Sequence, residues 1–175
     1  GTGSAAGTGL VTSLGGGDYS GSGIGLDVLL VLNAPMGNGV HNLDGAVACA
    51  ACTNGNAAAL DFNTLTNTFN IVGSVPSLGV GFTTLLTGTI TSHTVTSQGA
   101  FIEIQFAGSD SKSDALEAAL GLPSNTPWVL GGFSISVASD GTATSTDITN
   151  TAVPEPGTML LMGSGLLGLG LWRKF

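Results

Sequence analysis

The two cysteines of the chain, Cys49 and Cys52, have a spacing that redox enzymes and metal sites use. A thioredoxin-like site needs its first cysteine at the start of a helix, whereas this pair precedes an Asn-Gly turn. A c-type haem needs histidine directly after the second cysteine, where Thr53 stands. A zinc site would have to recruit His41 and His93, which are far from the pair in sequence. The spacing therefore favours none of these three chemistries.

Side chains suited to acid–base or nucleophilic chemistry are present, but they form no specific motif. Serine and threonine are too frequent for a Ser-His-Asp hypothesis to discriminate, and the sequence has no Gly-x-Ser-x-Gly elbow. Glu103 alternates outward on a predicted strand, and Asp110, Asp114 and Glu117 fit the start of a helix, so we expect all four at the surface. Residues 109–114 offer oxygens for a weak Ca²⁺ site, although their spacing is not that of an EF-hand. We therefore expect no enzyme activity, no metal and no cofactor.

The C-terminal segment carries the most distinctive pattern in the sequence. It begins with Val153-Pro154-Glu155-Pro156, in which two prolines fix φ and remove two amide donors. Neither a helix nor a sheet can absorb such a stretch, so it should be extended, exposed and accessible to a cleaving enzyme. An uncharged apolar run covers residues 158–172, and the basic pair Arg173-Lys174 follows it.

This apolar run predicts a single transmembrane helix. The sixteen residues from Gly157 to Trp172 would span about 24 Å, slightly less than the roughly 30 Å of a hydrocarbon core. Basic residues stay in the cytoplasm, which places the N-terminal part in the periplasm. Gly157, Gly165 and Gly168 would form a helix-packing face of small residues. A buried core helix is the alternative, and its glycines disfavour it in water. The predicted membrane anchor consists of Met159, Leu160, Leu161, Leu166, Leu167, Leu169, Leu171, Trp172, Arg173 and Lys174.

The Pro-Glu-Pro motif, the apolar helix and the basic end, in this order, resemble the PEP-CTERM sorting signal of exported bacterial proteins. The resemblance covers residues 153–175. It implies export, tethering in the inner membrane and processing near Pro154 to Pro156 by an exosortase-type enzyme. It also implies delivery to the cell surface or to an exopolysaccharide matrix. Because the chain begins without an apolar N-terminal region, we expect that a signal peptide has already been removed.

The export implied by this resemblance also bears on the cysteines. An exported chain folds in an oxidising compartment, where neighbouring thiols are commonly joined. We therefore predict a disulfide between Cys49 and Cys52 that staples a local loop. Since the loop is short, the bridge should remove little chain entropy and add little stability.

The composition restricts the partners of the exported part. Charged residues are only 8% of the chain, against a usual value of about 25%. The formal net charge is −8, with three Lys and Arg residues in total. A nucleic-acid partner is excluded, because binding it needs basic residues that displace counterions. Hydroxyl and amide groups must supply most of the polar surface.

The chain before the tail has the pattern of a β protein with one short helix. Residues 27–32 form a run that is apolar throughout after Asp27, typical of a strand buried on both faces. Residues 100–107 alternate apolar and polar side chains. Residues 113–120 predict a helix, with Ser113 as its N-cap and a Gly-x-Pro stop after it. We predict a core that includes Phe101, Ile104, Phe106, Leu116, Leu120, Phe133 and Ile135.

These elements predict a mainly β fold, a single antiparallel sandwich or jelly roll with one short helix. A β-solenoid is the alternative, and the absence of a fixed repeat period disfavours it. The predicted divisions are a Gly/Ser/Thr-rich arm at 1–25, a β-rich exported domain at 26–150, a linker with the sorting motif at 151–157 and the transmembrane helix with its basic end at 158–175.

Two functional hypotheses follow. The first is a non-catalytic surface or matrix protein that associates with identical chains or with exopolysaccharide through threonine-rich strand faces. Trp128, Tyr19 and the phenylalanines could add stacking surfaces for sugars, but aromatic residues are only 6% of the chain and we expect most of them in the core. The second hypothesis is an accessory subunit of a membrane complex, held by a retained tail. A hydrolase of matrix sugars is disfavoured, because no pair of acids can be assigned to a cleft.

Overall fold

A computed structural model describes residues 2–3, 9–50 and 52–152. Almost all of its regular structure is β, with one short helix, in agreement with the predicted class. The elements in chain order are β1 (Thr2–Gly3), β2 (Leu10–Gly15), β3 (Asp18–Leu26), β4 (Val28–Val31), β5 (Gly39–Asn42), β6 (Val47–Ala48), β7 (Asn56–Asn63), β8 (Thr68–Val75), the 3-10 turn η1 (Pro76–Leu78), β9 (Val80–Gln98), β10 (Phe101–Lys112), α1 (Asp114–Ala119), β11 (Trp128–Ala138) and β12 (Ala143–Ala152).

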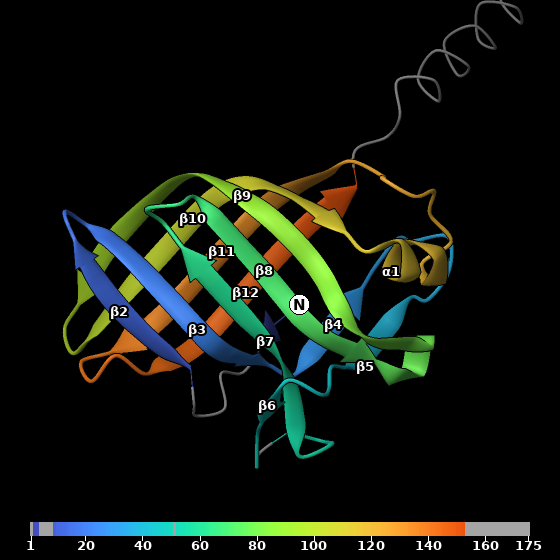
Figure 1. The fold of residues 1–175 in the computed structure, drawn as a ribbon, viewed down its shortest axis with the longest axis horizontal. Helices are drawn as coiled ribbons and strands as arrows, with labels where there is room; N and C mark the ends of the chain where they lie inside the picture. Colours follow the sequence, from blue (N-terminus) through green and yellow to red (C-terminus); the bar gives the residue numbers. More distant parts are fainter. Residues whose placement is uncertain (1, 4–8, 51, 153–175) are drawn as a thin grey trace, which may run out of the picture.

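Ten strands form one antiparallel sheet in the order β1-β12-β11-β10-β9-β8-β7-β3-β2, with β6 beside β7. The two ends of this order meet. The Val11 amide donates to the Gly141 carbonyl (2.8 Å), and the Ala143 amide donates to the Gly9 carbonyl (3.1 Å). The sheet therefore curls into a closed cylinder with obliquely running strands (Figure 1). This architecture corrects the predicted sandwich, since neighbouring strands continue one sheet instead of forming two facing sheets.

The core lies inside the cylinder. A pleated strand alternates its side chains between two faces, and the even-numbered residues of β10 from 102 to 112 point inward. Phe62, Phe106, Phe133 and Phe69 form an aromatic row, with ring centroids 5.0, 4.4 and 5.2 Å apart along it. Of the seven predicted core residues, Ile104, Phe106, Leu116, Leu120, Phe133 and Ile135 are buried.

Phe101 is the exception among the predicted core residues, since 47% of its surface is exposed. Its odd position on β10 gives it the orientation of the outward Gln105, opposite to that of Ile104 and Phe106. It also follows the β9–β10 turn at Gly99 and therefore lies at the rim of the cylinder. The hydrophobic side chain of Phe101 predicted a core position, but the alternation of side chains along β10 places it on the outer face.

The N-terminal part of the chain differs from the predicted arm. β2 and β3 pair with each other, β3 pairs with β7, and Val11 and Ile24 are buried in the core. The β-rich domain therefore includes residues that the sequence pattern assigned to an arm ending at residue 25. Alternating glycines and small hydroxyl residues gave these strands little hydrophobic signal.

The short helix and a hairpin cover one end of the cylinder (Figure 1). Ser113 caps α1 as predicted, since its hydroxyl accepts a hydrogen bond from the Leu116 amide (3.3 Å). The apolar run at 27–32 was predicted to be buried on both faces, and this is wrong. Its strand, β4, pairs only with β5 in a separate two-stranded sheet, which leaves Leu30 43% and Leu32 67% exposed.

Residues 151 and 152 of the predicted linker at 151–157 belong to β12. The rest of that linker and the predicted transmembrane helix at 158–175 lie outside the described residues. Within the described ranges, none of the helices has the length and apolarity needed to cross a membrane. β12, the last described strand, ends at Ala152 on the same side of the molecule as α1 (Figure 1). The sorting segment therefore begins directly after a strand of the closed sheet.

Candidate functional site

The predicted sorting motif Val153-Pro154-Glu155-Pro156, the membrane anchor and the glycine face at Gly157, Gly165 and Gly168 all lie outside the described residues. The structure does describe the point from which they start. Ala152 pairs with Trp128, the first residue of β11. The chain thus leaves the sheet next to α1 and away from the β2–β3, β9–β10 and β11–β12 turns (Figure 1).

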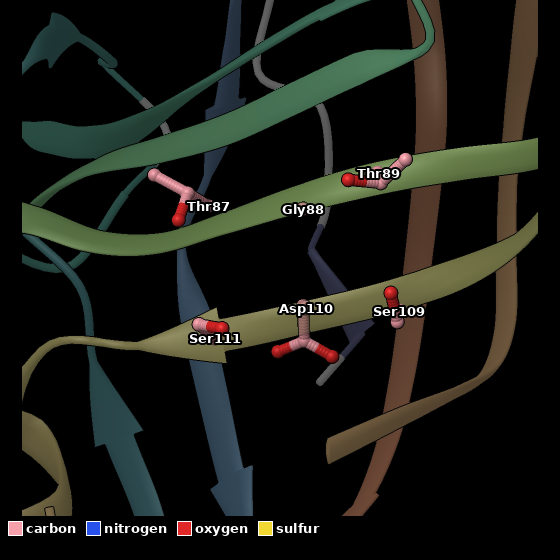
Figure 2. Close-up of a pocket in the computed structure, with 6 residues that line it drawn as sticks. All are labelled: Thr87, Gly88, Thr89, Ser109, Asp110 and Ser111. Carbon is pink, nitrogen blue, oxygen red and sulfur yellow. The ribbon is translucent and has the colours of Figure 1, made fainter. Parts of the chain in front are cut away.

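Uncharged hydroxyl groups line the outer face of β9 and β10. Thr89 lies opposite Ser109 and Thr87 lies opposite Ser111, and all four side chains are exposed. Figure 2 shows them on both sides of the inward pair formed by Gly88 and Asp110. They border a shallow, open depression of about 200 Å³. We call this surface the hydroxyl face.

The hydroxyl face continues onto the neighbouring strands. Thr68 of β8 pairs with Thr89, and Val129 of β11 lies between Ser109 and Thr151 of β12. One row therefore crosses five strands with four hydroxyl side chains and one valine. Such a row can donate and accept hydrogen bonds without the cost of desolvating a charge.

A second depression, of about 270 Å³, lies near the rim beside Phe101. The Glu103 carboxylate accepts hydrogen bonds from the side-chain amides of Gln98 (2.9 Å) and Gln105 (3.0 Å). Hydroxyl groups of β11 and β12 complete the border of this depression. The arrangement places one exposed aromatic ring next to a fixed set of polar groups. The lining residues are Gln98, Phe101, Ile102, Glu103, Ser136, Thr144 and Ser145.

Two acids that were expected at the surface are buried. Glu117 of α1 is fully enclosed, and its carboxylate accepts hydrogen bonds from the backbone N–H of Asn125 (2.6 Å) and from the Trp128 indole N–H (3.2 Å). Asp110 is 6% exposed and forms an ion pair with Lys112 at 2.7 Å. The surface prediction was wrong for both. β10 continues to Lys112 and turns Asp110 inward, whereas Glu117 lies on the face of α1 that meets Trp128 of β11.

Lys112 completes this buried group. Its ammonium lies 3.6 Å from the ring centroid of Trp128. Burial lowers the pKa of Lys112, while the Asp110 carboxylate opposes that shift. Asn150 of β12 also donates to Asp110, at 3.0 Å. We refer to Asp110, Lys112, Glu117, Trp128 and Asn150 as the Lys112 cluster.

The weak calcium site considered for residues 109–114 finds no support in this geometry. Asp110 points into the cylinder and contacts Lys112, whereas Ser109 and Ser111 point outward. Their oxygens are therefore on opposite faces of the sheet. Among the described residues, no group of three or more His, Cys, Asp or Glu side chains is placed to bind a metal ion.

Cys49 and Cys52 form the predicted disulfide, with Cα atoms 5.3 Å apart. Backbone hydrogen bonds hold the same loop, since the Cys49 amide donates to Gly55 (2.9 Å) and the Cys52 amide donates to Cys49 (3.1 Å). Both cysteines are buried against Ala57 of β7. The bridge thus fastens the turn that precedes β7 and is part of the structure.

The two histidines serve separate surface contacts. His93 Nε2 lies 3.0 Å from the Gly17 carbonyl and 3.7 Å from an Asp18 oxygen. His41 lies on β5, where its ring nitrogens contact the Gly37 carbonyl (2.8 Å) and the Ser77 hydroxyl (2.9 Å). Both rings therefore join loops to strands.

Comparison with known proteins identifies the C-terminal segment. A family model described as the PEP-CTERM protein-sorting motif matches residues 152–174, which include the motif residues and the anchor predicted above. Searches of curated proteins and of solved structures find no significant match for this chain. The chain therefore ends in a PEP-CTERM sorting signal, which marks an exported protein that is sorted by an exosortase-type enzyme.

Proposed function

We propose that the β-rich domain is a non-catalytic structural protein of the cell surface or extracellular matrix that binds exopolysaccharide. The observation that carries this proposal is the hydroxyl face, which crosses five strands with four hydroxyl side chains and one valine. The sorting signal supports it, because PEP-CTERM sorting suggests delivery to the cell surface.

The chemistry of the hydroxyl face suits a sugar polymer. A polysaccharide presents many neutral hydroxyls, and Thr and Ser side chains can both donate to them and accept from them. Phe101, with almost half of its surface exposed, supplies an apolar ring for the C–H face of a sugar. Gln98 and Glu103 beside it would fix the orientation through hydrogen bonds.

The closed sheet favours polysaccharide over self-association as the contact. Strand edges with free amides and carbonyls are the usual route by which β domains join identical copies. Here β1 pairs with β12, and an isolated bridge joins Leu10 of β2 to Thr142 just before β12, so the β2 end of the strand order is joined to the opposite end. We therefore assign the hydroxyl face, rather than a strand edge, to the partner.

A second function, an accessory subunit in a membrane complex, is favoured by a different surface. The β4–β5 hairpin exposes Leu30, Leu32, Met36 and Val40, with exposed fractions from 43% to 68%. An apolar group of this kind suits a protein contact more than a sugar contact. Chains with Leu32→Ser and Val40→Ser should then lose co-purifying membrane proteins, whereas a matrix protein would show no such loss.

Co-sedimentation with the exopolysaccharide of the native host tests the first function. The processed wild-type domain should sediment with the polymer, and Phe101→Ala combined with Thr89→Asp should reduce the bound fraction several-fold. Leu65→Ala is the matched control, because Leu65 is 65% exposed in the turn between β7 and β8. A wild-type domain that stays in solution at every polymer concentration would reject the proposal.

A further inference from the structure

Lys112 is the only lysine or arginine before residue 173, yet it lies inside the molecule. Its side chain is 8% exposed, and the Asp110 side chain beside it is fully buried. A lone basic residue that served solubility would lie in water. We therefore expect this buried amine to have its role among the residues of the Lys112 cluster.

The side chain of Asn150 meets Lys112 on the same carboxylate oxygen. Asp110 Oδ2 accepts from Lys112 Nζ at 2.7 Å and from Asn150 Nδ2 at 3.0 Å, so the amine and the amide converge on one acceptor atom. The other oxygens, Asp110 Oδ1 and Asn150 Oδ1, are buried and have no hydrogen-bond partner among the described residues. Buried polar atoms are normally paired, and these two are in contact with neither protein donors nor bulk water.

The surroundings of the amine favour its reactive form. Trp128 covers Nζ on one side, and Glu117 holds the Trp128 indole in place. Burial lowers the pKa of Lys112, which increases the share of neutral amine that can act as a nucleophile. The proton released by the amine has an acceptor at hydrogen-bond distance, namely Asp110.

We propose that Lys112 and Asn150 form an intramolecular isopeptide bond, and that Asp110 transfers the proton between the two reacting nitrogens. The bond would join β10 to β12 across β11. The proposal is independent of the polysaccharide contact, since it concerns residues inside the cylinder.

The reaction needs only the groups of the cluster. The lone pair of neutral Lys112 Nζ attacks Cγ of Asn150, and a new Nζ–Cγ bond forms. Asp110 Oδ2 takes a proton from Nζ and delivers it to Nδ2 as a general base and then a general acid. The Cγ–Nδ2 bond breaks, ammonia leaves, and Asp110 returns to its carboxylate form. The product is a secondary amide, and no oxidation or reduction occurs. Fixed proximity of amine and amide replaces a bimolecular encounter.

The position of the bond gives it a mechanical consequence. Asn150 lies two residues before Ala152, the last described residue, so the sorting tail follows directly after the cross-linked strand. Force applied through a tethered tail would reach Asn150 first and pass to β10 through a covalent bond. β12 could then not be peeled from the sheet by breaking its hydrogen bonds one after another.

Intact mass of the reduced, denatured chain tests the proposal, on either the full-length or the processed protein. Wild type should be lighter than its sequence mass by one ammonia molecule, whereas Lys112→Arg and Asn150→Ala should each match their sequence masses. Asp110→Asn should lower the cross-linked fraction at least several-fold while circular dichroism shows an unchanged sheet. Equal cross-linking in Asp110→Asn would overturn the role of Asp110.

Trypsin locates the bond, because a succinimide at an Asn-Gly pair such as Asn54-Gly55 loses the same mass. The peptide bond after Lys112 is the only tryptic site before residue 173, and an acylated lysine is not cleaved. Denatured wild type should therefore resist cleavage there, and a non-specific protease should release a branched peptide containing both residues. Asn54→Ala is the matched control and should keep the mass loss. Trypsin cleavage after Lys112 in a wild-type chain that was folded and then denatured would overturn the proposal.

Discussion

Phe133 has the most central place among the aromatic side chains. Its ring centroid lies 4.4 Å from that of Phe106 and 5.2 Å from that of Phe69, and 2% of its surface is exposed. These contacts join β8, β10 and β11 through the interior of the cylinder. Removal of the ring would leave a cavity that the closed sheet cannot easily fill.

Phe133→Ala should therefore lower the free energy of unfolding by about 3–5 kcal/mol. Urea denaturation followed by tryptophan fluorescence measures it, since Trp128 lies on the same strand. Phe101→Ala is the matched control and should change the free energy by no more than about 0.5 kcal/mol, because the ring is half exposed. Equal losses for the two variants would contradict the assignment of Phe133 to the core.

The same alternation explains which residues could be predicted from sequence. Ile104 and Phe106 were correctly predicted in the core, and Phe101 was not, because it has the opposite parity on β10. Asp110 shares the parity of Ile104, so its inward position was available from the pattern once the strand extended to Lys112. The sequence pattern predicted that this strand ends at residue 107, so Asp110 was not assigned to it. The proximity of Asn150 to Asp110, by contrast, depends on strand order, which no local pattern contains.

At the scale of elements, α1 is held to the sheet by a buried carboxylate. The helix is short, so its stability comes from its contacts with the sheet. Glu117 provides such a contact, because its carboxylate accepts hydrogen bonds from the backbone N–H of Asn125 and from the indole N–H of Trp128. Trp128 is the first residue of β11. The sequence predicted the helix and its cap from Ser113 onward, and it missed this anchor because an acid in a first turn is usually solvated.

Glu117→Ala should destabilise the fold by at least about 1–3 kcal/mol, the usual cost of leaving a buried donor without its partner. Glu117→Gln should cost less, since its amide oxygen can still accept one of the two hydrogen bonds. Thermal unfolding monitored by far-UV circular dichroism ranks the stability of the wild type, Glu117→Gln and Glu117→Ala. Asp114→Ala in the exposed first turn is the control, and a loss as large as that of Glu117→Ala would contradict the anchoring role.

For the whole molecule, closure of the sheet depends on the N-terminal strands. β2 and β3 supply Val11 and Ile24 to the core and connect β7 to the β11–β12 turn. The sequence predicted this segment as an arm because its glycines and serines give no clear hydrophobic period. Its part in the fold depends on long-range pairing, of β3 with β7 and of residues 9–11 with residues 141–143.

A chain that begins at Leu26 should therefore lose cooperative unfolding, because β1, β2 and nearly all of β3 are missing together with their core residues. A control that begins at Gly9 keeps the hydrogen bonds of Gly9 and Val11 to β12 and its turn, and it should unfold cooperatively. Urea titration with two probes, circular dichroism and fluorescence, distinguishes them. A cooperative transition in the shorter chain would mean that residues 1–25 are dispensable.

Sorting acts on the whole molecule through the motif after β12. Replacing Pro154, Glu155 and Pro156 together by Ala removes the sorting motif, restores two amide donors and removes two fixed φ angles. The variant should accumulate as a full-length chain in the inner-membrane fraction, while its domain keeps the wild-type melting temperature. Intact mass and cell fractionation measure this, with Leu65→Ala as a control that should sort normally.

The wild-type chain separates the two proposed functions. If it is a matrix protein, its intact native mass should correspond to a chain that ends between residues 153 and 156. A wild-type chain that retains Phe175 in cells with active exosortase would reject the matrix function and favour the membrane-complex subunit, whose anchor must stay in place.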